Sequence, residues 1–312
     1  MERENCVGFT VGVCATSPAS NLPGLLRAIQ SEAYPRELIL RRIVVVASGC
    51  HRSLLREIER LSLSDKRILL IEETQRQGKV EAVNQIIRNI DGQFLVLVNS
   101  DATPARGSIS RLLQEINSRQ DVGSVSALPI LPSGETATHK VLELMWTAHN
   151  VSSLELNHAG LSNHNCDELM VVRTGLLTEL PRNVVNDGAY IGGLVYSRGY
   201  RIVFSGDSRV GIDTPSRISD LVQQRRRILF GHAQVWRGLG RAPRTIESLM
   251  WTNPPLAIRL VGKALASRPD LLATLPLAVV TETVSGCLSI LDRLFWPARH
   301  VVWTRYRETI DA

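Results

Sequence analysis

The chain has few cysteines and few aromatic residues, and their distribution excludes several protein classes. The five cysteines are scattered along 312 residues, and no CxxC pair or Cys/His spacing typical of zinc ribbons occurs. This pattern argues against a disulfide framework and favours reduced thiols. There is no low-complexity run and no recognisable repeat, and 44% of the residues are hydrophobic, so we expect a folded core.

Two further signals are missing. No G-x-G-x-x-G follows an apolar run, which disfavours a dinucleotide-dependent dehydrogenase. The start, MERENCVGFT, lacks a basic and then apolar export signal, so we expect a cytoplasmic chain. Charge of one sign is in excess, however: the formal net charge is +6 and the pI is near 9.3. This favours an anionic partner, such as nucleotide phosphates, lipid phosphates, a membrane surface or nucleic acid.

Apolar runs and amphipathic segments alternate along the first hundred residues. Short β-branched runs predict strands, and the segments between them have the apolar spacing of helices. This alternation predicts an α/β fold with a mostly parallel sheet flanked by helices. The predicted strands are 7–15, 41–48, 67–73 and 94–98, and the predicted helices are 22–33, 52–61 and 79–90.

The second hundred residues are less regular. Strands are predicted at 124–130, 169–172 and 200–205, and helices at 135–156, 187–197 and 218–232. The segment 157–167 is rich in His and Asn and is interpreted as a loop. Its histidines and Cys166 could suggest zinc, but their spacings match no standard tetrahedral site. An acceptor-side loop is the preferred interpretation.

The chain changes character after about residue 240. Leu271 to Leu291 is nearly continuous in apolar and small residues and approaches the roughly 20 residues of a membrane span. Glu282 interrupts it, and a charge at mid-span is costly. We expect helices that lie in or against a membrane surface, with a buried core helix or a single span as the alternatives. Four of the five tryptophans lie beyond residue 230: Trp236, Trp251, Trp296 and Trp303.

The stretch from Gln75 to Ala102 carries the strongest functional signal. A basic-Gly-Lys turn opens a helix, and the following strand ends at Asn99-Ser100-Asp101. Ligands of α/β sheets bind outside the carboxyl ends of strands. A carboxylate there is a hard oxygen ligand, suited to a divalent cation that holds phosphates. The alternative is that Asp101 caps the next helix.

Three segments, in the same order, resemble family 2 glycosyltransferases with a GT-A fold. RQGKVEAVN followed by DGQFLVLVNSDA is similar to the donor-binding region, and ELPRNVVNDGAYIGGLVYSRGYRIVF is similar to the acceptor-side segment. DLVQQRRRILFGH resembles the Q-R-x-R-W motif of cellulose-synthase-like members, with Ile228 in place of the tryptophan. The resemblance covers residues 7–235. The loops ATSPAS and VVVASGC lack the acidic residues that many relatives carry there.

The resemblance implies a GT-A, Rossmann-like catalytic domain at 1–235 and a helical, membrane-associated region at 236–312. The donor half would span about 1–105 and the acceptor half about 106–235. The implied activity is metal-dependent, inverting transfer of a hexose from GDP-mannose or a UDP-sugar to a lipid-linked or saccharide acceptor. Polyprenyl phosphate or a glycolipid is the preferred acceptor. The protein would be peripheral on the cytoplasmic face of the membrane, without a nucleic-acid partner.

The resemblance also assigns residues to roles. Asp101 would hold Mn²⁺ or Mg²⁺, and Asp187 would be the general base, although it could equally be a helix cap. Arg226 is expected on a solvated or lipid-facing side of its helix. The donor and its diphosphate would contact Ala15, Thr16, Ser17, Ser48, Arg76, Gly78, Lys79, Asn99, Ser100, Gln224, Arg225 and Arg227.

Two other functional classes remain as alternatives. A nucleotidyltransferase would have a Gly-rich phosphate loop after the first strand, where this chain has ATSPASNLPG. A non-enzymatic basic module for membranes or nucleic acid would not need Asp101 and Asp187 in one cleft. The position of these two carboxylates therefore discriminates between the classes.

Overall fold

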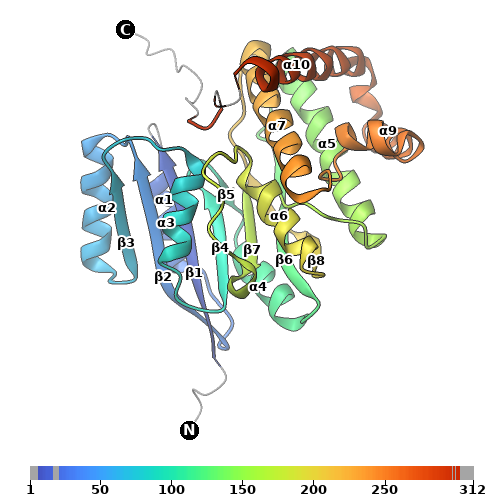
Figure 1. Ribbon diagram of the computed structural model, residues 1–312. Coiled ribbons are helices and arrows are strands. Elements are labelled where there is room, and N and C mark those ends of the chain that lie inside the picture. Colours follow the sequence, from blue (N-terminus) through green and yellow to red (C-terminus); the bar gives the residue numbers. More distant parts are fainter. Residues whose placement is uncertain (1–5, 17–20, 297, 299, 303–312) are drawn as a thin grey trace.

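The computed structural model describes residues 6–16, 21–296, 298 and 300–302. Its centre is an eight-stranded sheet with the order β3-β2-β1-β4-β7-β6-β8-β5 (Figure 1). The strands are β1 (Val7–Thr16), β2 (Leu38–Ser48), β3 (Ile68–Glu73), β4 (Phe94–Asn99), β5 (Thr103–Pro104), β6 (Val122–Ile130), β7 (Leu169–Arg173) and β8 (Arg201–Gly211).

Most neighbouring strands are parallel, as predicted, but two strands, β7 and the short β5, are reversed. β1 pairs in parallel with β2 and β4, and β2 pairs in parallel with β3. β6 and β8 are also parallel. β7 runs antiparallel to both β4 and β6, and the short β5 is antiparallel to β8. The reversal at β7 brings the start of this strand beside the end of β4.

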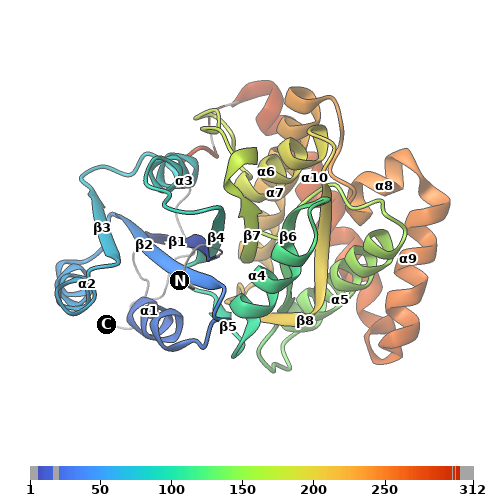
Figure 2. The same ribbon diagram turned by 90° about the horizontal axis from the view of Figure 1, so that it is seen from below.

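Helices cover both faces of the sheet (Figure 2). α1 (Leu22–Ser31), α2 (Arg52–Ser64) and α4 (Ser108–Ser118) pack on one face, and α3 (Lys79–Arg88) and α6 (Asp187–Ser197) on the other. In β2, Ile43 and Val45 join the first cluster, whereas Val44 and Val46 join the second. Because both faces are buried, the strand sequence is a continuous apolar run rather than an alternating one.

The remaining helices form one group beyond the β6–β8 side of the sheet. They are α5 (Ala137–His158), α7 (Ile218–Leu239), α8 (Ile246–Thr252), α9 (Pro254–Ser267) and α10 (Leu275–Phe295), with a 3₁₀ turn at Pro269–Thr274. Another 3₁₀ turn, Thr174–Leu176, follows β7. Val141 of α5, Leu221 of α7 and Ala278 of α10 share one apolar cluster. α7 crosses residue 235, the predicted boundary between the catalytic domain and the C-terminal region. Through this shared cluster, α10 packs directly on helices that precede the boundary.

α10 has its polar and apolar sides inverted relative to a helix of a water-soluble domain. Its buried side, spaced three or four residues apart, consists of small or polar side chains: Ala278, Thr281, Ser285, Ser289 and Asp292. Large apolar residues are exposed instead, including Val280 at 56%, Leu294 at 68% and Phe295 at 64%. α10 is therefore not the ordinary core helix that was one alternative for this segment.

Candidate active site

The carboxyl ends of the four parallel strands meet at one edge of the sheet. Thr16 lies beside Ser48, Ser48 beside Glu73, and Cys14 beside Asn99. Ala15, Thr16, Ser48, Asn99 and Ser100, all donor residues in the sequence prediction, are therefore neighbours along this edge. Ser17 lies outside the described residues.

Asp101 follows the end of β4, and the reversed β7 brings another carboxylate next to it. Val98 pairs with Leu169, so Glu168 lies beside Asn99. Asn99 Nδ2 donates a hydrogen bond to Glu168 Oε2 at 2.8 Å. Burial raises the pKa of Glu168 to about 8, and repulsion by the charges of Asp167 and Asp101 adds to this shift. Asp101 is not a helix cap, because α4 begins at Ser108 after Gly107.

Lys79, the first residue of α3, joins two carboxylates. Its Nζ lies 2.6 Å from Asp167 Oδ2 and 3.2 Å from Asp187 Oδ1. Burial opposes the charge of the ammonium group, but the two carboxylates outweigh this effect and raise the pKa of Lys79. The sequence analysis assigned Lys79 to the donor diphosphate. In this structure its charge is instead shared between Asp167 and Asp187.

The two carboxylates around Lys79 differ in their ionisation. Burial raises the pKa of Asp187, which is 2% exposed, and the charge of Lys79 only partly offsets this effect. Burial also acts on Asp167, but attraction to Lys79 and its hydrogen bond prevail and lower the pKa of that carboxyl. Asp167 is thus the more firmly ionised of the two, and Asp187 the more basic.

The carboxylate of Asp187 does not cap α6. Asn186, not Asp187, is the N-cap of α6, and its side chain accepts a hydrogen bond from the Ala189 amide. Gly188 permits the close approach of the opposite loop, because a Cβ there would lie 2.5 Å from the Cβ of Asp167. The capping role considered for Asp187 is therefore taken by its neighbour.

The basic cluster of α7 is divided among three directions, as consecutive helical residues must be. Arg227 donates to the Val185 carbonyl at 3.1 Å, and its charge favours ionisation of Asp167 and Asp187. Arg225 binds Glu282 of α10 and Glu247 of α8. This pairing places Arg225 between α8 and α10, and its contact with the donor stays a prediction. Gln224 is half-buried.

Arg226 corrects another expectation. It is 6% exposed rather than solvated, and it forms an ion pair with Asp292 of α10. His300 Nε2 lies 2.7 Å from the same carboxylate. The three side chains connect α7, α10 and the segment that follows α10.

That segment reaches the predicted donor turn. Gly78, before α3, has φ +102 and ψ 161, and a Cβ there would overlap the carbonyl oxygen of Val301. Arg76, half-buried in the same turn, lies against Gly49 at the end of β2. The turn is therefore packed between the loop after β2 and the chain that follows α10.

The histidines considered for zinc do not form a metal site with their neighbours. His149 and His164 pack against Phe204, and burial lowers the pKa of His164 to about 3. Within the described ranges, no group of three or more His, Cys, Asp or Glu side chains is arranged to hold a metal ion. Burial lowers the pKa of His149, His164 and His232, which favours their neutral form.

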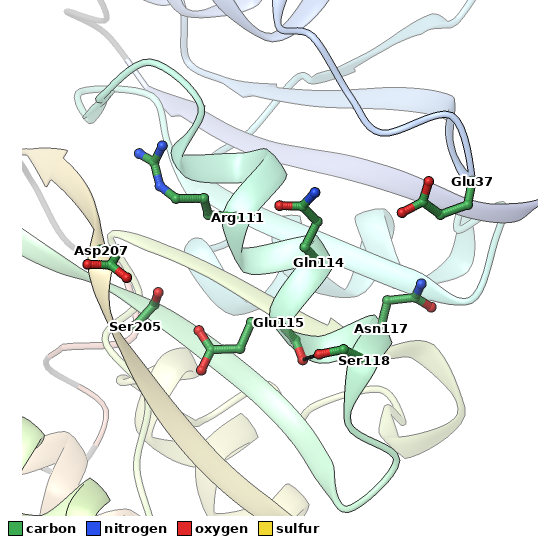
Figure 3. Close-up of a pocket in the computed structure, with 8 residues that line it drawn as sticks. All are labelled: Glu37, Arg111, Gln114, Glu115, Asn117, Ser118, Ser205 and Asp207. Atoms are coloured by element: carbon green, nitrogen blue, oxygen red, sulfur yellow. Dashed lines mark hydrogen bonds between the residues drawn. The ribbon is translucent and has the colours of Figure 1, made fainter.

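A separate surface pocket lies along α4, between this helix, the middle of β8 and the turn before β2 (Figure 3). Its volume is about 480 Å³, and its lining includes Glu37, Arg111, Glu115 and Asp207. Glu37 immediately precedes β2, whereas the carboxylates described above follow strand ends. Three acidic side chains to one arginine make this pocket a poor match for phosphates.

Asp167 and Glu168 are site residues that the sequence analysis did not identify. Asp167 was interpreted as the end of the His- and Asn-rich loop 157–167, and Glu168 was left unassigned between this loop and the predicted strand 169–172. One available signal is that the two acids directly precede the apolar run LMVV, which was predicted to be a strand. Their meeting with Asp101 and Asp187 depends on the direction of β7, which that run does not indicate.

Comparison with family models indicates one family, and comparison with solved structures indicates one fold. A model of the family described as "Glycosyltransferase like family 2" matches residues 7–231. Mannosyltransferase PcManGT from Pyrobaculum calidifontis, solved with GDP-Man and Mn²⁺, has a TM-score of 0.63 and 21% identity, over 92% of this chain and 86% of its own. GalNAc-T7, solved with UDP, GalNAc and Mn²⁺, has a TM-score of 0.52 and 12% identity, over 80% and 57%. A comparison with curated proteins gave no significant match.

Proposed function

The chain belongs to glycosyltransferase-like family 2, and we propose that it transfers a hexose from a nucleotide-diphosphate sugar with inversion at the anomeric carbon. The observation that carries the proposal is a run of neighbouring ionisable side chains at the carboxyl edge of the sheet. It extends from Asp101 through Glu168, Asp167 and Lys79 to Asp187. Family membership favours this activity over both alternatives, the nucleotidyltransferase and the non-enzymatic module.

In the proposed reaction with a glycolipid, Asp187 accepts the proton of the attacking acceptor hydroxyl. A polyprenyl phosphate is already ionised and needs no base, so Asp187 would then orient the acceptor. The acceptor oxygen bonds to the anomeric carbon as the bond to the diphosphate breaks, and the nucleoside diphosphate leaves with the electron pair. The raised pKa of Asp187 suits this role, because burial makes its carboxylate a stronger base. Arg227 and Arg76 contribute positive charge near the leaving diphosphate.

Asp101 is the residue proposed to hold a divalent cation. The donor set fits: a hard carboxylate oxygen follows a strand end, and the neighbouring Glu168 is repelled by its charge. A cation there would relieve this repulsion. Mn²⁺ or Mg²⁺, when bound, would neutralise negative charge on the diphosphate.

The donor is proposed to be GDP-mannose or a UDP-sugar. The support comes from the two similar structures, one solved with GDP-Man and the other with UDP. Ala15, Thr16 and Ser48 would line the nucleoside end of the site, and Gly78 would let the backbone approach the phosphates. No acidic side chain follows β2 in the segment ASGC, so backbone groups and Ser48 would contact the base.

The acceptor is proposed to be membrane-borne, a polyprenyl phosphate or a glycolipid, with the protein peripheral on the cytoplasmic face. Pro269–Phe295 is long and apolar enough to cross a bilayer, and 22% of its most apolar window is buried. Its exposed apolar side is what an interfacial helix presents to lipid. Glu282 does not oppose this arrangement, because it faces inward to Arg225. Trp251, 87% exposed on α8, adds an interfacial aromatic side chain.

The first prediction concerns Asp101. Asp101→Asn should abolish the stabilisation by GDP or UDP that depends on Mn²⁺, because it removes the protein's charged ligand. Thermal unfolding with each nucleotide, with and without Mn²⁺, measures this effect directly. The variant should also lose at least about a hundredfold in turnover with radiolabelled GDP-mannose or UDP-sugars, since charge stabilisation at a leaving group contributes on this scale.

The matched control is Asp91→Asn, at the other end of the same strand. Asp91 precedes β4, and its side chain is 51% exposed. It should keep metal-dependent nucleotide binding and turnover. Full activity of Asp101→Asn, or equal losses in both variants, would refute the metal assignment.

A further inference from the structure

We propose that Lys79 and Asp167 are positioning residues for transfer: Asp167 draws the ammonium group of Lys79 away from Asp187, so that Asp187 can accept the acceptor's proton. The inference rests on the proposed role of Asp187 as the base. It assigns a function to Asp167, which lies in a loop without a role in the reaction described above. It also gives Lys79 a function other than binding the diphosphate.

The geometry around the ammonium group is asymmetric. Lys79 Nζ donates a hydrogen bond to Asp167 Oδ2 at 2.6 Å. Asp187 Oδ1 lies farther away, at 3.2 Å, so its ion pair with Lys79 is the longer of the two. A short, charge-assisted hydrogen bond is the stronger of the two contacts. The ammonium is therefore committed mainly to Asp167.

Such an arrangement solves a problem of the buried base. Asp167 and Asp187 both contact the same ammonium group and are therefore close to each other. Without that cation the two carboxylates would repel, and one of them would take up a proton. If Lys79 faced Asp187 alone, their ion pair would stabilise the carboxylate and weaken it as a base. Shared between two carboxylates, the ammonium keeps Asp187 ionised without forming an exclusive ion pair with it.

Other groups that act on Asp187 come from each element packed around it. Arg227 of α7 adds positive charge, and the Cys14 thiol of β1 is close enough to be affected by the carboxylate. Asp167 disfavours ionisation of Asp187, whereas Lys79 favours it. Removing Asp167 and removing Lys79 should therefore change the basicity of Asp187 in opposite directions.

The test is the dependence of kcat/KM on pH. The assay follows hydrolysis of GDP-[¹⁴C]mannose with Mn²⁺, in which water serves as acceptor, or of the UDP-sugar that replaces it in a donor screen. Activity falls on the acidic side as Asp187 takes up a proton. Lys79→Met should move this acidic limb to higher pH, and Asp167→Asn should move it to lower pH. Each shift should be about one unit or more, which is the effect of a nearby charge.

The double variant Lys79→Met/Asp167→Asn removes one charge of each sign and should bring the limb back toward that of the wild type. It also keeps the test decisive if Lys79→Met, with two buried carboxylates and no ammonium, fails to fold. Lys66→Met, on an exposed turn before β3, is the matched control and should leave the limb in place. Stabilisation of each variant by GDP and Mn²⁺ shows that the fold is intact.

Two limbs that move in the same direction, or do not move, would overturn the inference. A higher KM for the donor in Lys79→Met with an unmoved limb would also overturn it, because Lys79 would then bind the diphosphate. Asp187→Asn separates this outcome from failure of the proposed function. If Asp187→Asn is fully active, the base assignment itself is wrong. If it is inactive while the limbs stay in place, only the role of Lys79 and Asp167 is wrong.

Discussion

At the scale of single residues, the site depends on two glycines at positions where a side chain would not fit. Gly78 and Gly188 both border the candidate site, and each lies against another part of the chain where a Cβ has no room. Gly78 also has a backbone conformation that is essentially restricted to glycine. These two positions let Val301 approach the donor turn and let Asp167 approach Asp187.

Gly78→Ala should lower the free energy of unfolding by about 1–3 kcal/mol, because alanine is strained at this φ and ψ. It should also raise the KM for the donor, since the turn must shift away from Val301. Urea unfolding and donor kinetics measure the two effects. Gly175→Ala is the control: no atom lies within 4 Å of its Cβ position, so the change should stay within about 0.5 kcal/mol. Equal stabilities for the two variants would contradict the packing described for Gly78.

At the scale of elements, α7 connects the catalytic sheet to the C-terminal helices. Its consecutive arginines point to different partners: Arg225 to α8 and α10, Arg226 to Asp292, and Arg227 to the loop before α6. The Asp292 carboxylate is fully buried, and its ionic partners come from α7 and from His300. One helix thus supports the candidate site and fixes α10 with the same short run of charge.

Arg226→Met should destabilise the protein by about 3–5 kcal/mol, because it leaves the charge of Asp292 buried without its main partner. The double variant Arg226→Met/Asp292→Leu should recover much of this loss, since an apolar pair often replaces a buried ion pair at little cost. Urea unfolding measures both. Arg27→Met, which removes an ion pair between side chains that are 60% and 44% exposed, should cost less than about 1 kcal/mol. A loss for Arg226→Met no larger than this would refute the argument.

At the scale of the whole molecule, the apolar helix and the candidate site are parts of one arrangement. α10 packs its small and polar side on α7 and leaves its large apolar side uncovered. The chain that follows α10 continues to Val301, which lies against the donor turn at Gly78. A membrane in contact with α10 would therefore lie on the side of the molecule from which the proposed lipid-linked acceptor would reach the site.

Replacing Leu294 and Phe295 by serine should weaken binding to lipid vesicles by about tenfold or more. Burying one large apolar side chain contributes roughly 1.5–3 kcal/mol, and both residues are more than 60% exposed. Co-sedimentation with vesicles that contain anionic lipid measures the effect. Leu63→Ser on α2, where the side chain is 72% exposed, should leave binding unchanged. Equal binding by all three proteins would show that this side of α10 does not contact lipid.

The sequence by itself determined the parallel half of the sheet and the edge at which the candidate site lies. Apolar periodicity is a local property, and it indicated β1 to β4 and α6. The observed bounds of α6, Asp187 and Ser197, are those that were predicted. Parallel strands bring their carboxyl ends together whatever follows them, so Ser48, Asn99 and Asp101 could be expected at one edge.

Only the tertiary structure decided which charges meet there. The run LMVV predicts a strand but not its direction. In a parallel strand, Asp167 and Glu168 would lie at the opposite edge of the sheet, whereas the antiparallel β7 places them near Asp101 and Lys79. The partners of Arg225 and Arg226 were equally hidden, because they lie between 22 and 66 residues away in the sequence. Strand direction and helix docking depend on contacts between distant segments, and a local pattern does not encode them.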